Sequence, residues 1–263
     1  MYETNFHKAA TAQEAAALLN ASEDGKILAG GQTLIPTMKQ RLADPTDVID
    51  LSGAADLRGI NISGDQVTIG AMVTHAEVAG HAALAALCPS ISQLAANIGD
   101  PSVRHRGTIG GSLANNDPAA DYPAAVLALN ARIRTSLREI AADDYFEGMF
   151  TTALEDHEII TAISFTAPTQ GGYGKFPNPA SRYAMAGVFV AKSADGTVRV
   201  AVTGASEDGV HRHGGLEAAL SADWSASAVD GVEISSDGLL SDLHGNAEYR
   251  ANLIKVMTKR ALG

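Results

Sequence analysis

The sequence contains a single cysteine, Cys88, and this scarcity excludes several kinds of site. No disulfide can form within the chain. Iron–sulfur clusters and Cys₄ zinc sites each require several thiolates, so this chain alone cannot hold them. Because low cysteine usage without disulfides is typical of a reducing compartment, we expect a cytoplasmic protein.

Long apolar runs and long basic runs are also missing. No stretch of about 18 apolar residues occurs, which excludes a membrane-spanning helix, and the polar segment 1–10 does not resemble a signal peptide. The formal net charge of −11 argues against nucleic acid as a partner, because such binding depends on Lys and Arg at phosphates. A chain of 263 residues with 46% hydrophobic residues can build one large domain or two small ones.

Two familiar nucleotide-binding motifs are absent, G-x-G-x-x-G and the P-loop, but two other glycine segments are present. They read Ala29-Gly30-Gly31-Gln32-Thr33-Leu34 and Thr108-Ile109-Gly110-Gly111-Ser112-Leu113. Glycine permits positive φ and close approach of the backbone, and successive N–H groups in such turns form anion sites. Either segment alone is most simply a turn. Together they indicate a ligand with two phosphates held from both sides, such as a dinucleotide.

Hydrophobic periodicity and turn residues predict a mixture of helices and strands. The expected helices cover 12–19, 34–41, 82–87, 91–98, 123–129, 216–220 and 247–262. The expected strands cover 26–29, 48–51, 66–70, 131–136, 159–165, 183–192 and 197–202. Thr74 and Glu77 have the spacing of a capping box at a helix start. The proline- and glycine-rich segment 168–179 predicts a linker, and the strands and helix beyond it predict an α+β C-terminal domain.

Several longer segments resemble one known family. They are AGGQTLIP at 29–36, KQRLA at 39–43, VIDL at 48–51, IGAMVTH at 69–75, IGDPSVRHRGTIGGSLANNDPAADYP at 98–123, and the final helix at 247–262. In this order they resemble the FAD-binding (medium) subunit of molybdenum hydroxylases, a group that includes aerobic carbon monoxide dehydrogenase and xanthine dehydrogenase. The resemblance covers nearly the whole chain.

The resemblance implies an α+β fold with a vanillyl-alcohol-oxidase/PCMH-type FAD-binding domain in residues 1–170, divided into lobes of about 1–55 and 56–170. A smaller α+β C-terminal flavoprotein domain would occupy 171–263. It further implies that noncovalently bound FAD takes electrons from a small 2Fe-2S subunit and passes them to a quinone, NAD or oxygen. Hydroxylation would occur at the molybdenum cofactor of a large molybdopterin-binding subunit, in a dimer of heterotrimers.

Individual roles also follow from the resemblance. The N–H groups of Gly30 to Thr33 would bind phosphate oxygens with help from the Thr33 hydroxyl, while Thr108 and Ser112 would offer hydroxyls to phosphate or ribose. The other cofactor-binding residues implied are Ala29, Gly31, Gln32, Leu34, Ile98, Ile109, Gly110, Gly111, Asp121, Ile160, Lys175 and Tyr183. Asp121 would accept hydrogen bonds from ribitol or ribose hydroxyls, although capping of the helix that starts near Pro123 is an alternative. Ile98 and Ile160 would line a ring or belong to the core.

Near Lys175 the sequence departs from the family, because Phe176-Pro177-Asn178-Pro179 replaces the basic residues that often follow this lysine. Arg104, His105 and Arg106 form a small basic cluster that either contacts phosphate or a partner, or is a solvated loop. We interpret the histidines, including His75, as surface or hydrogen-bonded core residues, and expect no metal site and no catalytic residue. The alternatives are a stand-alone flavin oxidase or reductase with its own small substrate, and a docking subunit that has lost its flavin site.

Overall fold

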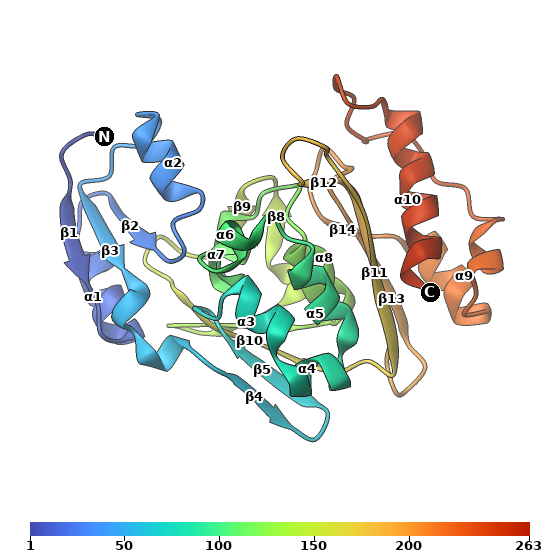
Figure 1. The fold of residues 1–263 in the computed structure, drawn as a ribbon, viewed down its shortest axis with the longest axis horizontal. Coiled ribbons are helices and arrows are strands. Elements are labelled where there is room, and N and C mark those ends of the chain that lie inside the picture. Colours follow the sequence, from blue (N-terminus) through green and yellow to red (C-terminus); the bar gives the residue numbers. More distant parts are fainter.

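The computed structural model describes all of residues 1–263, and its three parts lie in a row (Figure 1). The N-terminal part contains a three-stranded parallel sheet in the order β1–β3–β2. Its strands and helices are β1 (Asn5–Lys8), α1 (Ala12–Ala21), β2 (Gly25–Leu28), α2 (Leu34–Lys39) and β3 (Asp47–Asp50). Helix α1 begins at Thr11, whose side chain accepts a hydrogen bond from the N–H of Glu14. The helix buries Ala15 and Leu19 in a small core with Ile49 of β3.

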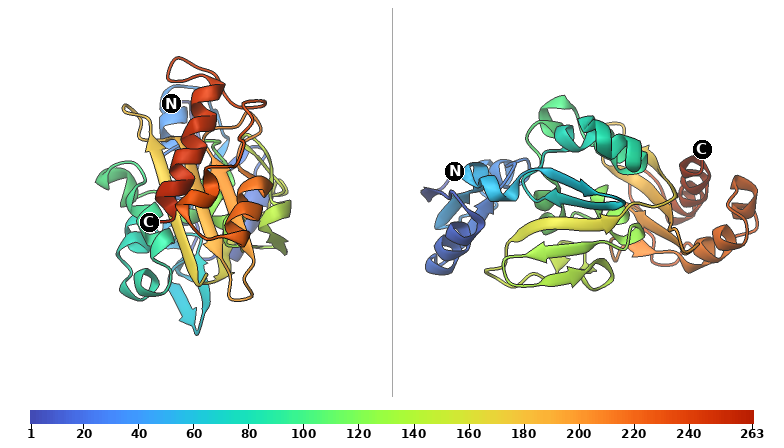
Figure 2. Two further views of the ribbon diagram at one scale, coloured as in Figure 1. Left: turned by 90° about the vertical axis from the view of Figure 1, so that its right-hand side faces the viewer. Right: turned by 90° about the horizontal axis from the view of Figure 1, so that it is seen from below.

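The central part is a five-stranded antiparallel sheet in the order β4–β5–β10–β6–β7, with helices packed on one face (Figure 2, right). The strands are β4 (Ile60–Ser63), β5 (Gln66–Gly70), β6 (Arg132–Thr135), β7 (Glu139–Ala141) and β10 (Ile160–Thr166). The helices are α3 (His75–Gly80), α4 (Ala82–Leu87), α5 (Pro89–Ala96), α6 (Pro101–Arg104), α7 (Ile109–Asn115) and α8 (Tyr122–Ala128). A short hairpin of β8 (Phe146–Gly148) and β9 (Thr151–Thr152) follows the sheet's edge strand β7.

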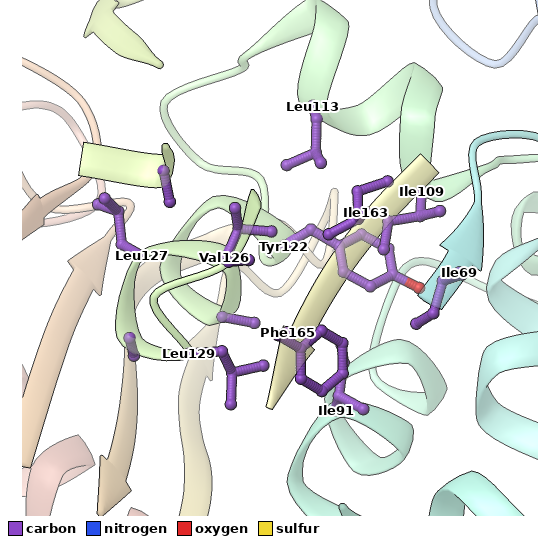
Figure 3. Close-up of a cluster of buried hydrophobic side chains, with 14 of the residues drawn as sticks. Ile69, Ile91, Ile109, Leu113, Tyr122, Val126, Leu127, Leu129, Ile163 and Phe165 are labelled. Atoms are coloured by element: carbon purple, nitrogen blue, oxygen red, sulfur yellow. The ribbon is translucent and has the colours of Figure 1, made fainter. Parts of the chain in front are cut away.

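The largest core lies around α8, of which every residue is buried. Tyr122 and Val126 of this helix face Ile163 and Phe165 of β10 (Figure 3). The helix also contacts β12 and β13 of the C-terminal part. Because burying apolar surface is the main favourable term in folding, α8 joins the central and C-terminal parts of the molecule.

The C-terminal part is a four-stranded antiparallel sheet in the order β11–β12–β13–β14, covered by two helices (Figure 2, left). Its elements are β11 (Gln170–Pro177), β12 (Ala184–Lys192), β13 (Val198–Thr203), β14 (His211–Arg212), α9 (Gly214–Ala222) and α10 (Ala247–Ala261). Asn246 caps the start of α10, and the buried Arg250 of that helix donates to the carbonyls of Met185 and Gly204. None of the helices combines the length and the apolar character needed to span a membrane.

The prediction of a linker over 168–179 is wrong, because most of that segment is strand β11. Its glycines serve close packing instead of flexibility. A Cβ on Gly172 would lie 1.8 Å from the carbonyl oxygen of Ala261, and one on Gly174 would lie 2.2 Å from that of Met257. Helix α10 therefore lies directly on the strand backbone, and only glycine allows this distance.

Most of the other expected elements are confirmed, with ends that differ by a few residues, and so is the capping box of Thr74 and Glu77. The strands missed by the sequence analysis are the short β1, β4, β7, β8, β9 and β14. Helices α6 and α7 were also missed. These elements contain two to seven residues, which is too short for a periodic pattern to be distinguished from a loop.

The contact between α10 and β11 gives a first prediction. Gly174→Ala should lower the free energy of unfolding by about 3 kcal/mol, because the added methyl group must displace the backbone of α10. Urea denaturation of the purified chain measures this. Gly80→Ala is the matched control, since nothing lies within 4 Å of its Cβ position. Equal midpoints for the two variants would contradict the account of this interface.

Candidate functional site

A cleft of about 650 Å³ lies where the N-terminal part, the helices of the central part and a loop of the C-terminal part meet. Every residue predicted to bind the cofactor lines this cleft, except Ile109 and Lys175. The cleft walls also include part of the segment 98–121, the start of β10 and the loop 181–183. The cleft volume is in the range typical of small-molecule and cofactor sites.

The first glycine segment connects β2 to α2 and adopts the conformation expected of it. Gly31 has φ +71°, which is accessible to glycine without strain. The N–H groups of residues 30–33 donate no hydrogen bond within the chain, and Thr33 does not cap α2 with its side chain. A row of unpaired donors at a helix N-terminus is a favourable environment for an anion such as phosphate.

The second glycine segment is a helix start and not the amide turn that we expected. Thr108 is the N-cap of α7, and its hydroxyl accepts a hydrogen bond of 3.1 Å from the N–H of Gly111. The N–H of Gly110 donates to the carbonyl of Ala71 at 2.9 Å. A Cβ on Gly110 would also lie 2.6 Å from that of Ala71, so this glycine is required for packing. Two hydroxyl-bearing residues of this segment, Thr108 and Ser112, line the cleft. The Ser112 hydroxyl has no partner in the chain.

The two glycine segments touch each other. A Cβ on Gly30 would lie 2.2 Å from the carbonyl oxygen of Arg106 and 2.7 Å from Cα of Gly107. A Cβ on Gly111 would lie 3.6 Å from that of Ala29. The unpaired amides of the first segment and the hydroxyls of the second therefore face one cleft, as a diphosphate ligand requires.

Asp121 forms a buried polar cluster with two residues of β11. Its carboxylate accepts a hydrogen bond from the Tyr173 hydroxyl and forms an ion pair of 2.9 Å with Nζ of Lys175. Burial raises the pKa of Asp121, and Lys175 and Tyr173 oppose this by stabilising the carboxylate. Burial and the neighbouring carboxylate raise the pKa of Tyr173, so the phenol remains the donor.

This cluster changes two expectations. Asp121 occupies the N-cap position of α8, but its side chain makes no capping hydrogen bond. Each of its carboxylate oxygens already has a partner, so it reaches the cleft as a paired group. Lys175 lies outside the cleft lining and donates to the carbonyl of Asn97 in addition to Asp121. Ile109 is fully buried in the central core, and its N–H donates to Val73, so its side chain lies away from the cleft.

Ile98, Ile160 and Tyr183 line the cleft as expected. Ile160 begins β10 and is buried, whereas Tyr183 is 45% exposed at the mouth. Burial, and then the neighbouring Asp117 and Asp121, raise the pKa of Tyr183. The rings of a planar ligand would find apolar and aromatic surface here.

His75 is a site residue that the sequence analysis missed. It is buried, lines the cleft, and has no hydrogen-bond partner at Nδ1, whereas we had interpreted it as a surface or hydrogen-bonded core histidine. Burial, with a smaller effect of Arg104, lowers its pKa to about 4. The main-chain N–H of His75 donates to the carbonyl of Gly107, and a Cβ on Gly107 would lie 2.5 Å from Nε2 of the ring. The available signal was its place at the end of IGAMVTH.

Other lining residues were missed or left open. Ser181 and Arg182 come from the loop after β11, Asn115 is the last residue of α7, and Asp117 lies in the loop that follows. Arg104 of the basic cluster donates to the carbonyls of Ile98 and Gly99, and so shapes the cleft edge. No group of histidines, cysteines and carboxylates with metal-site geometry occurs in the structure.

Comparison with known proteins shows to which family the chain belongs. Residues 2–168 match the family model described as the FAD binding domain in molybdopterin dehydrogenase. The chain belongs to this family. As a member of it, the chain is an FAD-binding subunit of an oxidoreductase, and its fold class is the one that we expected.

Similar proteins cover almost the full chain. The nicotine 6-hydroxylase medium subunit of Paenarthrobacter nicotinovorans is 38% identical over 96% of this chain and 94% of its own length. The carbon monoxide dehydrogenase medium chain of Hydrogenophaga pseudoflava is 34% identical, over 98% and 95%. Among solved structures, reconstituted carbon monoxide dehydrogenase from Oligotropha carboxidovorans superposes with a TM-score of 0.89 at 34% identity, covering 99% of this chain and 96% of that chain.

The contact between the two glycine segments gives a second prediction. Gly30→Ala should weaken FAD binding at least 10-fold, because the methyl group separates the free amides from residues 106–107. Quenching of FAD fluorescence on titration of the apoprotein measures the dissociation constant. Gly80→Ala again serves as the control with a vacant Cβ position. An unchanged dissociation constant for Gly30→Ala would show that the contact does not shape the site.

The buried imidazole gives a third prediction. The pKa of His75 falls from 6.5 to about 4 on folding, so the unfolded chain takes up the proton first as pH decreases. The stability from this group is complete above about pH 6.5 and is lost as pH falls toward 4. Between pH 7 and pH 5 the free energy of unfolding should fall by about 2 kcal/mol more for the natural apoprotein than for the His75→Gln variant. Urea denaturation at both pH values measures the difference, and parallel losses would contradict it.

Proposed function

We propose that the cleft holds FAD noncovalently and that the chain passes electrons from a partner 2Fe-2S subunit to an external acceptor. The observation that carries this is the row of unpaired N–H groups at residues 30–33, in contact with the segment that bears Thr108 and Ser112. An FAD diphosphate would accept hydrogen bonds from these amides. Within this cleft Lys26 and Arg182 are the cationic side chains, so main-chain dipoles would be the principal phosphate ligands.

The remaining roles follow from where side chains lie. We assign Ala29, Gly31, Gln32 and Leu34 to the phosphate segment, and Gly110 and Gly111 to the backbone that supports Ser112. Ile98, Ile160 and Tyr183 would contact the adenine or isoalloxazine rings. Asp121 would accept from a cofactor hydroxyl through lone pairs that Tyr173 and Lys175 leave open, since a carboxylate offers about four acceptor sites. FAD supplies one- and two-electron redox chemistry when bound, and the chain binds and orients it.

We also propose the division of the chain into an FAD-binding domain at 1–170, with lobes of about 1–55 and 56–170, and a C-terminal domain at 171–263. The separate sheets of the three parts support this division. Its main boundary would lie where β10 is followed by β11. A cytoplasmic location is part of the same proposal, and the single buried thiol of Cys88 is compatible with it.

The partners that we propose are a large molybdopterin-binding subunit and a small 2Fe-2S subunit, in a dimer of heterotrimers. Relatives are named as medium chains or subunits, and one cysteine cannot ligate a cluster. The names of the relatives refer to nicotine, carbon monoxide and glyceraldehyde. Because chains of one fold serve such different molecules, we assign the choice of substrate to the large subunit.

Purification of the tagged chain from its own cells tests the proposal. We expect a yellow complex that releases FAD on acid denaturation and contains an iron–sulfur chain and a large molybdenum-binding chain. Reduction of the molybdenum subunit by its substrate should bleach the flavin absorbance through the iron–sulfur chain. A colourless chain that takes up no FAD would contradict the proposal. Steady turnover of a small reductant by the isolated yellow chain would favour the alternative of a stand-alone oxidase or reductase.

A further inference from the structure

The tip of the β8–β9 hairpin exposes two large apolar side chains. Met149 is 43% exposed and Phe150 is 62% exposed, and neither lines the cleft. Single exposed apolar residues are common on protein surfaces. Two adjacent exposed apolar residues at a hairpin tip form a small apolar projection, and the backbone of this tip is unusual.

The backbone at the tip has a conformation that is unfavourable for a bulky residue such as Phe150. Phe150 has φ +56°, in the left-handed region that bulky residues avoid. Asn116, which is buried, holds the tip in place. Its Nδ2 donates to the carbonyls of Gly148 and Thr151 at 2.8 and 2.9 Å. Its main-chain carbonyl accepts a hydrogen bond from the N–H of Phe150 at 3.0 Å. A strained and exposed aromatic residue that the surroundings fix so firmly indicates a function.

The residue that fixes the tip lies between two residues of the cleft wall. Asn116 is the C-cap residue of α7, the helix that begins at the second glycine segment. Its neighbours Asn115 and Asp117 line the cleft. A protein that bound the tip would therefore lie next to the cofactor, which transfer of electrons between separate redox centres requires.

Acidic residues border the tip. Glu147 precedes Met149 in β8 and is exposed. A Cβ on Gly209 would lie 3.7 Å from the N atom of Met149, so the segment that carries the exposed Glu207 and Asp208 lies beside the tip. Apolar side chains with an acidic border are complementary to an apolar pocket with a basic rim.

We propose that Met149 and Phe150 are the docking point for the iron–sulfur subunit, which receives them in an apolar pocket with a basic rim. The inference rests on the proposed function, because it assumes that this subunit donates electrons to the cofactor in the cleft. Preorganisation by Asn116 reduces the conformational entropy that docking would otherwise cost. The apolar pair supplies affinity, and the acidic border supplies orientation.

Co-purification of the complex with tagged variants tests the docking point. Phe150→Gly removes the ring and suits the positive φ, so this variant should fold at least as well as the natural chain. Combined with Met149→Ser, it should lower the iron-to-FAD ratio of the purified complex at least 10-fold, whereas FAD per chain stays unchanged. Phe150→Tyr should retain the iron. Leu243→Ser, at a residue that is 91% exposed in the loop before α10, is the matched control and should also retain it.

Two results would overturn the docking point. One is an unchanged iron-to-FAD ratio and an unchanged rate of flavin reduction in the Phe150→Gly, Met149→Ser variant. The other is loss of the large subunit with the iron–sulfur chain retained, because the tip would then bind the wrong partner. Failure of the proposed function looks different, since the natural chain itself would then lack FAD or an iron–sulfur partner. Higher salt should release iron from the natural complex more readily, as an acidic border implies.

Discussion

The site depends on one contact, in which the backbone of Gly30 lies against the backbone of residues 106–107. These segments belong to different parts of the molecule, and no side chain fits between them. The contact brings the free amides of residues 30–33 to the hydroxyls of Thr108 and Ser112 across a single cleft. An anion is attracted there by oriented N–H dipoles, and no lysine or arginine needs to be buried with it. His75 supports the same contact through the hydrogen bond of its main-chain N–H to the carbonyl of Gly107 and through the packing of its ring against Gly107.

Charge is buried in only a few places, and one of them connects the parts of the chain. Asp121 immediately precedes α8 in the central part, whereas Tyr173 and Lys175 lie on β11 of the C-terminal part. An ion pair this deeply buried contributes little net stability, but removing one partner would leave an uncompensated charge. The cluster therefore fixes the position of β11 beside the cleft. The glycines of β11 in turn allow α10 to lie directly on the backbone of this strand, which completes the C-terminal part.

Long periodic segments and the first glycine segment could be predicted from the sequence, because their patterns are local. The apolar face of α10 is visible in its sequence, and residues 29–34 form the loop that their glycines indicate. Other features depend on neighbours distant in the chain. The glycines of β11 indicated a loop, although they are there because the backbone of α10 packs against them. The second glycine segment looked like an amide turn because its Thr108 cap and the Ala71 acceptor are tertiary features. The pairing of Asp121 with Lys175, the burial of Ile109 and the role of His75 were hidden for the same reason.

Hydrogen–deuterium exchange tests the central claim most directly. The amides of residues 30–33 have no acceptor within the chain, so they should exchange rapidly in the apoprotein. Addition of FAD should protect the peptide that contains them, while peptides of α10 on the far side remain unchanged. Protection confined to other segments, with residues 30–33 still exchanging at the rate of the apoprotein, would contradict the claim that these amides bind the cofactor.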